Sequence, residues 1–460
     1  MSLNLKGKRV LVLGLGATGM SMARWLTLRE AQVSVADTRE APPYVQQLRA
    51  ELPDARLHLG AFRSEYFSGA EIIAISPGVP LSEPAVRRAH ESGIPIVGDI
   101  ELFAHVREEF PESKVIGITG SNGKSTVTEM VGAMCKSTGI RTLVAGNIGL
   151  PILDAIADID AGRRRRPDIF VLELSSFQLE ATETLHPEAA AVLNLSEDHL
   201  DRYDGMREYA EAKAKIFMGD GVQVVNREDD WSRSMAIKDR CVFTFGLDEP
   251  AGRNAWGLRT VDGQTWLSQG LENLMQVTEL KVAGSHNMAN ALAALALCRA
   301  IRLPYPPLLQ ALRSFAGLPH RVQRVAEVQG VQYFDDSKGT NVGATVAALA
   351  GIGRPVVIIL GGDGKGQDFS PLRDAVAKHA RAVVLIGRDR ELIAKTLSGL
   401  PLAVERASDM ADAVARAAML ARSGDAVLLS PACASFDMFL SYEHRAQSFV
   451  DAVRTLEARQ

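Results

Sequence analysis

The stretch "KVIGITGSNGKSTVTEM", residues 114–130, has the features of a loop that holds phosphate. An apolar, β-branched run leads into glycines, which are followed by Lys124, the hydroxyl pair Ser125 and Thr126, and a helical pattern. In such loops backbone N–H groups surround phosphate, the lysine meets the β- and γ-phosphate oxygens, and a hydroxyl reaches Mg²⁺. The strict GxxxxGK[ST] spacing is absent, because Ile118 stands where the first glycine would be. Strand, loop, lysine and helix still occur in the required order, so the stretch predicts a site for ATP or GTP. The residues expected around the nucleotide phosphates are Gly120, Ser121, Asn122, Gly123, Lys124, Ser125 and Thr126.

A nucleotide loop also needs an acidic residue that holds the metal, commonly at the end of a neighbouring strand. The segment "DIFVLELSSFQLE" (168–180) supplies Glu173 at the end of an apolar run. The segment "NLSEDHLDRY" (194–203) follows the next expected strand, so His199 should lie on a loop at the same edge of the sheet. A lone histidine is more often structural than a ligand, and the pattern by itself leaves both roles open for His199.

An earlier stretch offers a second phosphate site. In "RVLVLGLGATGMSMARWL" (9–26), Gly14, Gly16 and Gly19 fit GxGxxG between a strand and a helix, and Asp37 follows about twenty residues later. This pattern specifies a pyrophosphate at a helix N-terminus with an acidic residue near the sugar or base. NAD(H) and a UDP-sugar both satisfy it, and a tight turn without a ligand is a third interpretation.

Composition excludes several classes of function. The net charge of -4 gives no general attraction to polyanions, so nucleic acid is not an expected partner. The basic run "RRRR" at 163–166 reads as a solvated loop, and no apolar run reaches the roughly 18 residues of a membrane span. The N-terminus lacks the apolar core of a signal peptide, and the four cysteines are scattered without a CxxC pair. We therefore expect a cytoplasmic protein that is not associated with membranes.

Short apolar runs alternate with helical patterns along the chain, which predicts parallel sheets covered by helices. The charged, proline-containing segment 107–113 reads as a linker, and the segment 314–325 carries Gly and Pro at a second boundary. We expect an α/β fold of three domains: a Rossmann-like domain at 1–104, a central P-loop mononucleotide-binding domain at 105–317, and a second Rossmann-like domain at 318–460.

The combination of motifs resembles the Mur ligases of peptidoglycan synthesis, and within them the member that adds D-glutamate. The resemblance covers essentially the whole chain. The nucleotide loop is shared by the superfamily, including folylpolyglutamate synthase, whereas "SSFQLE", "DHLDRY" and "SPACASFDMF" are particular to the D-glutamate member. The motifs occur in the order "GITGSNGKST", "LELSSFQLE", "LNLSEDHLDRY", "GSHNMANALAALAL", "GLPHRVQ", "DDSKGTN", "LGGDGKGQDF" and "LSPACASFDMF".

The resemblance implies which nucleotide belongs to which loop. In the family the first loop holds the UDP of the cell-wall precursor, the second holds ATP, and the last domain binds the amino acid. The implied partners are UDP-N-acetylmuramoyl-L-alanine and D-glutamate, which an ATP-dependent acid–D-amino-acid ligase joins through an acyl phosphate. We expect a monomer that uses two Mg²⁺ ions.

The resemblance also implies roles for individual residues. Lys124 should stabilise the transferring phosphoryl group, while Ser125 and Glu173 hold the first Mg²⁺. His199 matches the family's second-metal histidine, close to the substrate. Lys213, in "EYAEAKAKIF", matches the family's carbamylated lysine, although its pattern alone suggests an exposed helix residue. The contacts implied for the UDP precursor are Thr18, Asp37, Thr38 and Asn147; for ATP, Asn290, Arg321, Asp336 and Lys338; and for D-glutamate, Thr340, Lys365, Ser435, Phe436 and Tyr442.

One position departs from the family pattern: Ala446 follows Arg445 where glycine is frequent, which leaves the local turn open. Three rival functions also stay open. They are a ligase of the same chemistry for another amino acid, an NAD-dependent dehydrogenase suggested by the first glycine loop alone, and a non-catalytic module regulated by nucleotide.

Overall fold

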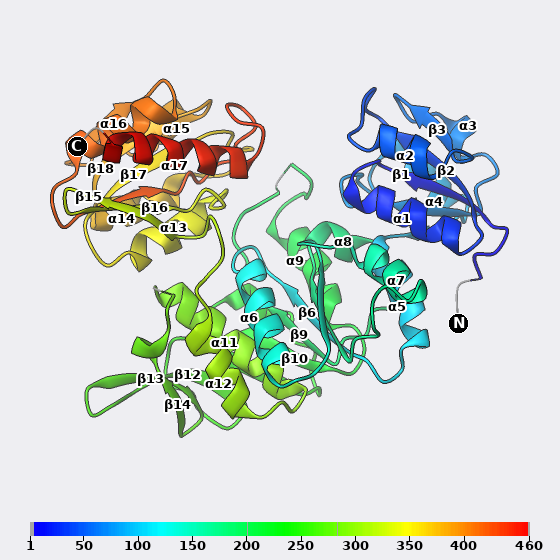
Figure 1. Ribbon diagram of the computed structural model, residues 1–460, viewed down its shortest axis with the longest axis horizontal. Coiled ribbons are helices and arrows are strands. Elements are labelled where there is room, and N and C mark those ends of the chain that lie inside the picture. Colours follow the sequence, from blue (N-terminus) through cyan, green and yellow to red (C-terminus); the bar gives the residue numbers. More distant parts are fainter. Residues whose placement is uncertain (1–3, 200, 283, 459–460) are drawn as a thin grey trace.

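The computed structural model describes residues 4–199, 201–282 and 284–458, which form three sheets with helices packed around each (Figure 1). The first sheet is parallel, with strand order β3-β2-β1-β4-β5. The order reverses between β1 and β4, and open α/β sheets bind ligands beyond the carboxyl ends of strands at such a point. Gly14 follows β1 and Ser76 follows β4, so the first glycine loop lies there. The elements are β1 (Arg9–Leu13), α1 (Ala17–Leu28), β2 (Gln32–Asp37), α2 (Val45–Glu51), β3 (Arg56–Leu59), α3 (Ser64–Phe67), β4 (Ile72–Ile75), α4 (Pro84–Glu91), β5 (Ile96–Val97) and α5 (Asp99–Val106).

The second sheet carries the nucleotide loop at its centre. Its order is β14-β13-β12-β11-β10-β9-β6-β8-β7, so β6 lies between β8 and β9. Ile118 pairs with Glu173 and Thr119 with Val192, which brings the ends of all three strands to one edge. The elements before the loop and around it are β6 (Lys114–Thr119), α6 (Lys124–Ser137), β7 (Thr142–Gly146), α7 (Ile152–Asp160), β8 (Ile169–Glu173), α8 (Ser176–Glu180), β9 (Ala189–Val192) and α9 (Met206–Ala214).

The second sheet ends in an antiparallel meander that the expectation of parallel sheets did not include. Strands β12 and β13 are joined by Asp262 and Gly263, whose φ angles are 51° and 75°. Positive φ at both central residues marks a type I′ hairpin, for which Asp-Gly is a preferred sequence. The remaining elements are β10 (Val222–Asn226), α10 (Asp230–Ser234), β11 (Val242–Phe245), β12 (Ala255–Val261), β13 (Gln264–Gln269), β14 (Glu272–Gln276), α11 (Ser285–Ala300) and α12 (Tyr305–Ser314).

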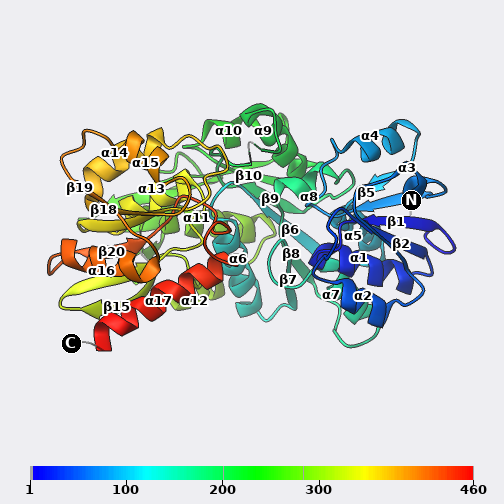
Figure 2. The ribbon, with the colours of Figure 1, turned by 90° about the horizontal axis from the view of Figure 1, so that it is seen from above.

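The third sheet has the order β15-β16-β20-β17-β18-β19, and only β15 runs antiparallel to its neighbour. We call the segments that carry the first, second and third sheets the first, central and third parts of the chain; their sheets lie within residues 9–97, 114–276 and 323–429. Figure 2 shows the first and third parts on opposite sides of the central sheet. The elements of the third part are β15 (Gln323–Val328), β16 (Val331–Asp335), α13 (Val342–Gly351), β17 (Val356–Gly361), α14 (Ser370–His379), β18 (Ala380–Ile386), α15 (Arg390–Thr396), β19 (Ala403–Arg406), α16 (Met410–Leu420), β20 (Ala426–Leu429) and α17 (Tyr442–Ala458).

The expected α/β fold with three dominantly parallel sheets is confirmed. The sheets lie within residues 9–97, 114–276 and 323–429, and helix α5 spans the first proposed boundary. The boundaries near 104 and 317 stay predictions. The four arginines at 163–166 are exposed, as a solvated loop requires. Within the described residues, no helix has both the length and the apolar character needed to cross a membrane.

Candidate active site

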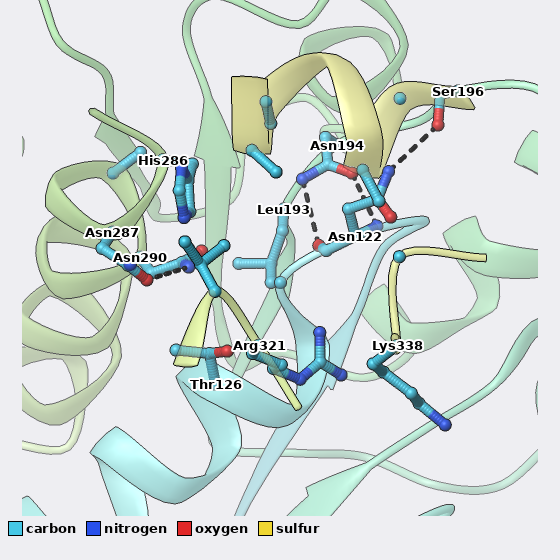
Figure 3. Close-up of a pocket in the computed structure, with 18 of the residues that line it drawn as sticks. Asn122, Thr126, Leu193, Asn194, Ser196, His286, Asn287, Asn290, Arg321 and Lys338 are labelled. Atoms are coloured by element: carbon cyan, nitrogen blue, oxygen red, sulfur yellow. Dashed lines mark hydrogen bonds between the residues drawn. The ribbon is translucent and has the colours of Figure 1, made fainter. Parts of the chain in front are cut away.

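The nucleotide loop joins β6 to α6 and is fixed from the neighbouring strand end. Gly123 has φ 84°, and a Cβ there would lie 2.6 Å from Oδ1 of Asn290, so the loop admits no larger residue without movement. Asn194, just after β9, accepts from the Asn122 amide at 2.9 Å and donates to the Asn122 carbonyl at 3.1 Å (Figure 3). These paired bonds preorganise the loop, because they hold its backbone in place without a ligand.

Lys124 lies across the loop that it follows. Its Nζ donates to the carbonyl oxygens of Gly120 at 2.7 Å and Ser121 at 2.9 Å. Burial lowers the pKa of Lys124, and the charges of Glu173 and Asp198 oppose that effect. The ammonium is therefore inside the loop, where it can exchange carbonyl partners for phosphate oxygens.

Glu173 ends β8 beside the loop and is 1% exposed. Its Oε1 accepts from Nδ2 of Asn147 at 2.8 Å, while its buried Oε2 has no hydrogen-bond partner among the described residues. An unpaired buried carboxylate oxygen is costly, so this atom is suited to a cation. No group of three or more His, Cys, Asp or Glu side chains among the described residues could hold a metal ion. A metal here therefore needs other ligands, such as a hydroxyl, phosphate oxygens or a modified side chain.

Lys213 lies at the same edge and is buried, with 1% exposure. The interpretation of this lysine as an exposed helix residue was wrong, because α9 packs that face against the end of β6. Its Nζ donates to the Gly120 carbonyl at 3.0 Å and to Oγ1 of Thr119 at 3.3 Å. The Nζ also lies 4.7 Å from the ring centroid of Tyr209.

The surroundings of Lys213 favour its neutral amine. Burial lowers its pKa well below the ordinary value, the Lys124 charge lowers it further, and Asp198 and Glu173 oppose them. The hydrogen bonds of Nζ go to a carbonyl and a hydroxyl oxygen, and no ion pair with a described residue offsets its desolvation. A neutral buried amine next to a nucleotide loop is a nucleophile toward CO₂.

His199 lies on the loop between β9 and α9, in a left-handed conformation with φ 58°. Its ring is edge-on to Phe177, with centroids 4.6 Å apart, and its Nε2 lies 3.7 Å from Oδ2 of Asp198. Burial lowers the pKa of His199, Asp198 opposes this, and the charges of Lys365 and Lys124 lower it further. The ring is therefore kept neutral, as a metal ligand must be.

The third part of the chain touches the nucleotide loop directly. Arg321 donates from Nη2 to Oγ of Ser125 at 2.9 Å. Asn341 donates from Nδ2 to Oδ1 of Asn122 at 3.1 Å and to Oδ2 of Asp198 at 3.3 Å. A cavity of about 350 Å³ lies between the two parts (Figure 3). Four residues implied as ATP contacts line it: Asn290, Arg321, Asp336 and Lys338.

The charges in this cavity are strongly desolvated. Burial raises the pKa of Asp336 to about 7, although the Ser430 hydroxyl donates to its carboxylate at 2.7 Å. Burial and the charge of Arg321 lower the pKa of Lys338 to about 8. The Nζ of Lys338 lies 3.7 Å from the ring centroid of Tyr442. The cations Arg321 and Lys338 would attract a polyanion that replaces water in the cavity, whereas an ionised Asp336 would repel it.

A separate cavity of about 550 Å³ lies at the first glycine loop and is lined by Thr18, Asp37 and Thr38. The Asp37 carboxylate accepts from the Leu15 amide at 2.6 Å and from the amide, Nε and Nη2 of Arg39 at 2.7–2.9 Å. Burial alone would raise the pKa of Asp37, but these bonds hold it below the ordinary value. Both oxygens are thus engaged, so a ligand that contacts this carboxylate must replace one of these bonds.

Asn147 links the cavity of the first glycine loop to the strand end beside the nucleotide loop. It lines the cavity of the first glycine loop and donates to Glu173 beside the nucleotide loop. The first glycine loop and the nucleotide loop are therefore close in space, although they are about a hundred residues apart in sequence.

Three family models match successive parts of the chain. They are the Mur ligase MurD-like N-terminal domain at residues 8–98, the Mur ligase middle domain at 118–298 and the Mur ligase glutamate ligase domain at 320–433. The chain belongs to the Mur ligase family.

Relatives with curated names are similar to this Mur ligase over its full length. UDP-N-acetylmuramoylalanine–D-glutamate ligase of Nitrosospira multiformis is 56% identical over 99% of this chain and 97% of that protein. The protein of the same name from Methylobacillus flagellatus is 55% identical over 100% and 99%.

Solved structures of the family share the fold. UDP-N-acetylmuramate-alanine ligase of Thermotoga maritima matches with a TM-score of 0.61 at 19% identity, covering 97% of this chain and 99% of that one. Folylpolyglutamate synthase of Mycobacterium tuberculosis, solved with ADP and AMPPCP, matches with a TM-score of 0.54 at 18% identity, covering 79% and 96%.

The residues that the Mur ligase resemblance implies for D-glutamate differ widely in exposure. Lys365 is exposed with φ 50°, and Phe436 is 74% exposed, whereas Ser435 is 3% exposed. Tyr442 begins α17, and Thr340 follows Lys338 on the loop after β16. Their roles stay predictions. Ala446 is buried inside α17, so helix and not a turn occupies the position where the family often has glycine.

Several residues of this Mur ligase site were absent from the sequence-based set. Asn194 and Asp198 follow β9, Tyr209 donates to or accepts from Ser121 Oγ at 3.1 Å, and Asn341 caps α13. The polar run after "AAAVL" was a usable signal for Asn194, because the ends of parallel strands share one edge. No comparable signal indicates Asn341, which reaches the loop from the third part.

Proposed function

We propose that this Mur ligase catalyses the ATP-dependent addition of D-glutamate to UDP-N-acetylmuramoyl-L-alanine, in the synthesis of the peptidoglycan precursor. The observation that carries the proposal is the adjacency of two phosphate sites, linked by Asn147 and Glu173. A hydride-transfer enzyme has no use for the second site, whereas a ligase for a nucleotide-linked acid needs both. The full-length similarity to D-glutamate ligases supports the choice of amino acid.

The chemistry explains the need for ATP, because a carboxylate is a poor electrophile until one oxygen becomes a leaving group. An oxygen of the alanine carboxylate attacks the γ-phosphorus, and ADP departs, which leaves an acyl phosphate. The amino nitrogen of D-glutamate then attacks the carbonyl carbon and loses a proton. The tetrahedral intermediate expels phosphate, and the new amide bond remains.

The protein's contribution is positioning and charge. Lys124 would neutralise charge on the transferring phosphoryl group from inside the loop. Arg321 and Lys338 would face the nucleotide from the third part of the chain, and Asn290 would line its cavity. Asn147 would orient the muramoyl end of the first substrate beside Glu173.

The residues present suit two Mg²⁺ ions, which supply charge neutralisation at the phosphate oxygens when they are bound. Ser125, Glu173, His199 and a carbamylated Lys213 would hold them. The unpaired Oε2 of Glu173 and the neutral ring of His199 support this assignment. Carbamylation joins the neutral Lys213 amine to the carbon of CO₂ with release of one proton, and it leaves an anionic carbamate in place of the amine.

A coupled assay of phosphate release tests the proposed function. Release from ATP should require both UDP-N-acetylmuramoyl-L-alanine and D-glutamate, and the product should contain one amide-linked glutamate by mass spectrometry. Equal turnover with another amino acid would indicate a different ligase of the same chemistry. Release without either acceptor would indicate a nucleotide-regulated module.

The first site should bind UDP and not NAD. Because this cavity lies beside a second, nucleotide-binding loop, as a ligase for a nucleotide-linked acid needs, NADH should bind at least about 100-fold more weakly than the UDP precursor. Calorimetry with each ligand measures the two dissociation constants. Tight NADH binding that competes with UDP-N-acetylmuramoyl-L-alanine would contradict the assignment.

Amino-acid choice should depend on Lys365 in the third part. Its ammonium is exposed and its charge lowers the pKa of His199, so it can meet the side-chain carboxylate of D-glutamate on this side of the nucleotide loop. Lys365→Ala should raise the KM for D-glutamate about tenfold or more while the KM for ATP changes little. Lys378→Ala, at an exposed lysine on α14, is the control. An unchanged dependence on D-glutamate in Lys365→Ala would move the specificity site elsewhere.

A further inference from the structure

Arg202 in the "DHLDRY" motif joins the central part of the chain to the first part. Its Nε and Nη2 donate to the two carboxylate oxygens of Glu180 at 3.2 and 2.6 Å. Its Nη1 and Nη2 also donate across the boundary to the carbonyl oxygens of Pro77 at 3.1 Å and Val79 at 3.4 Å. The guanidinium carbon lies 4.5 Å from the ring centroid of Phe177. Each of its three nitrogens thus has a partner in a nearly buried setting, with 11% of the side chain exposed.

The carbonyl oxygens that accept hydrogen bonds from Arg202 belong to residues that line the cavity of the first glycine loop, which we call the UDP cavity. Residues 76–79 follow β4 and all four line the cavity of the first glycine loop. Ser76 donates from Oγ to the carbonyl of Gly14 at 2.9 Å, which ties this wall to the glycine loop itself. A movement of residues 76–79 would therefore change the shape of the cavity that holds the first substrate.

The other end of the connection is the loop of His199. The Arg202 amide donates to the His199 carbonyl at 2.9 Å, and Phe177 contacts both the guanidinium and the His199 ring. Glu180, the partner of Arg202, ends α8, and Figure 1 shows α8 and α9 on the side of the central part that faces the first part. A continuous set of contacts thus runs from the first glycine loop to His199.

We propose that Arg202 is a positioning residue of the ligation reaction, which fixes residues 76–79 of the UDP cavity to the loop that carries His199. This rests on the proposed function. By setting the two loops relative to each other, Arg202 determines how closely the carboxylate of the bound precursor approaches the γ-phosphate. A misplacement of about 1 Å can reduce the rate about 100-fold, so a contact remote from the reacting atoms matters.

The geometry requires arginine and not merely a positive charge. The planar guanidinium meets a carboxylate with two parallel N–H donors and still presents donors to two carbonyls. A lysine ammonium is a single point and cannot reach both Glu180 and the two carbonyls in this arrangement. Arg202→Lys should therefore fail as Arg202→Met does.

A second bridge between the same parts offers a matched control. Arg24 on α1 donates to Asp154 on α7 at 3.3 Å, yet neither residue lines the UDP cavity. If general docking of the two parts were all that mattered, loss of either bridge would have the same effect.

The test is steady-state kinetics of the full-length enzyme with each substrate varied in turn. Arg202→Met and Arg202→Lys should both lower kcat/KM for UDP-N-acetylmuramoyl-L-alanine about 100-fold, while the KM for ATP changes less than about twofold. Arg24→Met should change both parameters less than about twofold. Equal effects of Arg202→Met and Arg24→Met would overturn the proposal, as would full activity of Arg202→Lys.

Hydrogen exchange followed by mass spectrometry supplies a readout that does not depend on catalysis. Peptides covering residues 76–83 should exchange about tenfold faster in Arg202→Met than in wild type or Arg24→Met, because the loop loses its anchor. Unchanged exchange in a folded Arg202→Met protein would refute the positioning role of Arg202. If exchange became faster in Arg202→Met but the wild-type protein did not ligate the proposed substrates, the positioning role would stand and the proposed function would be rejected.

Discussion

A Lys124→Ala variant should turn over at least about 100-fold more slowly than wild type when ATP is saturating. Phosphoryl transfer is catalysed mainly by positioning and by charge that is stronger toward the transition state than toward bound ATP. Lys124 Nζ already lies within the loop, at 2.7 and 2.9 Å from two of its carbonyl oxygens. The ammonium therefore needs little reorganisation to meet a phosphoryl oxygen. In the alanine variant, the negative charge of the transferring phosphoryl group is no longer neutralised by this residue.

The kinetic signature distinguishes catalysis from binding. Loss of a binding contact alone raises KM and leaves kcat unchanged, whereas loss of a transition-state contact lowers kcat. Lys136→Ala, at an exposed lysine in the last turn of α6, is the control and should keep wild-type kinetics. Circular dichroism should show that both variants are folded. If saturating ATP restored wild-type turnover to Lys124→Ala, the lysine would serve only to bind nucleotide.

The sequence predicts the fold well where local pattern and sheet topology agree. Continuous apolar runs that end in glycine predicted β1 and β6, because a strand covered on both faces leaves no polar alternation. The antiparallel strands β12–β14 were missed, although the Asp262-Gly263 turn was a signal for them. Their pairing depends on a turn conformation, which a pattern of strands alternating with helices does not include.

The candidate site could be predicted only where it follows strand ends. Glu173 was predicted at the end of an apolar strand. In the structure it pairs with Ile118 near the end of β6, so it lies beside the nucleotide loop. The burial of Lys213 could not be predicted from the sequence. The segment "EYAEAKAKIF" carries charges on several faces of the helix, and tertiary packing decides which face is covered. The contact of Arg321 with Ser125 likewise depends on how the third part docks, which no local pattern encodes.

Lys213→Ala should be nearly inactive, with turnover reduced at least about 100-fold because the metal loses an anionic oxygen ligand. Short carboxylic acids such as formate or acetate should restore part of that activity. Truncation of the lysine side chain leaves a space next to Thr119 and Gly120, and a small carboxylate can bring two oxygens into that space. Glu211→Ala, on an exposed face of α9, should keep wild-type activity and show no response to acid.

The charge of the substituted residue should decide whether rescue occurs. Lys213→Arg keeps a cation and fills the space, so it should be inactive and resist rescue. Isotopically labelled CO₂ supplies a direct test, since wild type should show a carbamate carbon resonance that Lys213→Ala lacks. A wild-type spectrum without that resonance at saturating CO₂ would contradict the modification.

The surroundings of Lys213 favour both the formation of the carbamate and its persistence once formed. Burial and the Lys124 charge lower its pKa, so the neutral amine that attacks CO₂ is populated at lower pH than for an exposed lysine. Once formed, the anionic carbamate is attracted by the same Lys124 charge that repelled the ammonium. Lys124→Ala should therefore also weaken the labelled resonance of Lys213, and the effects of the two substitutions on turnover should not be additive. Wild-type activity of Lys213→Ala in CO₂-depleted buffer without added acid would show that the buried amine takes no part in the reaction.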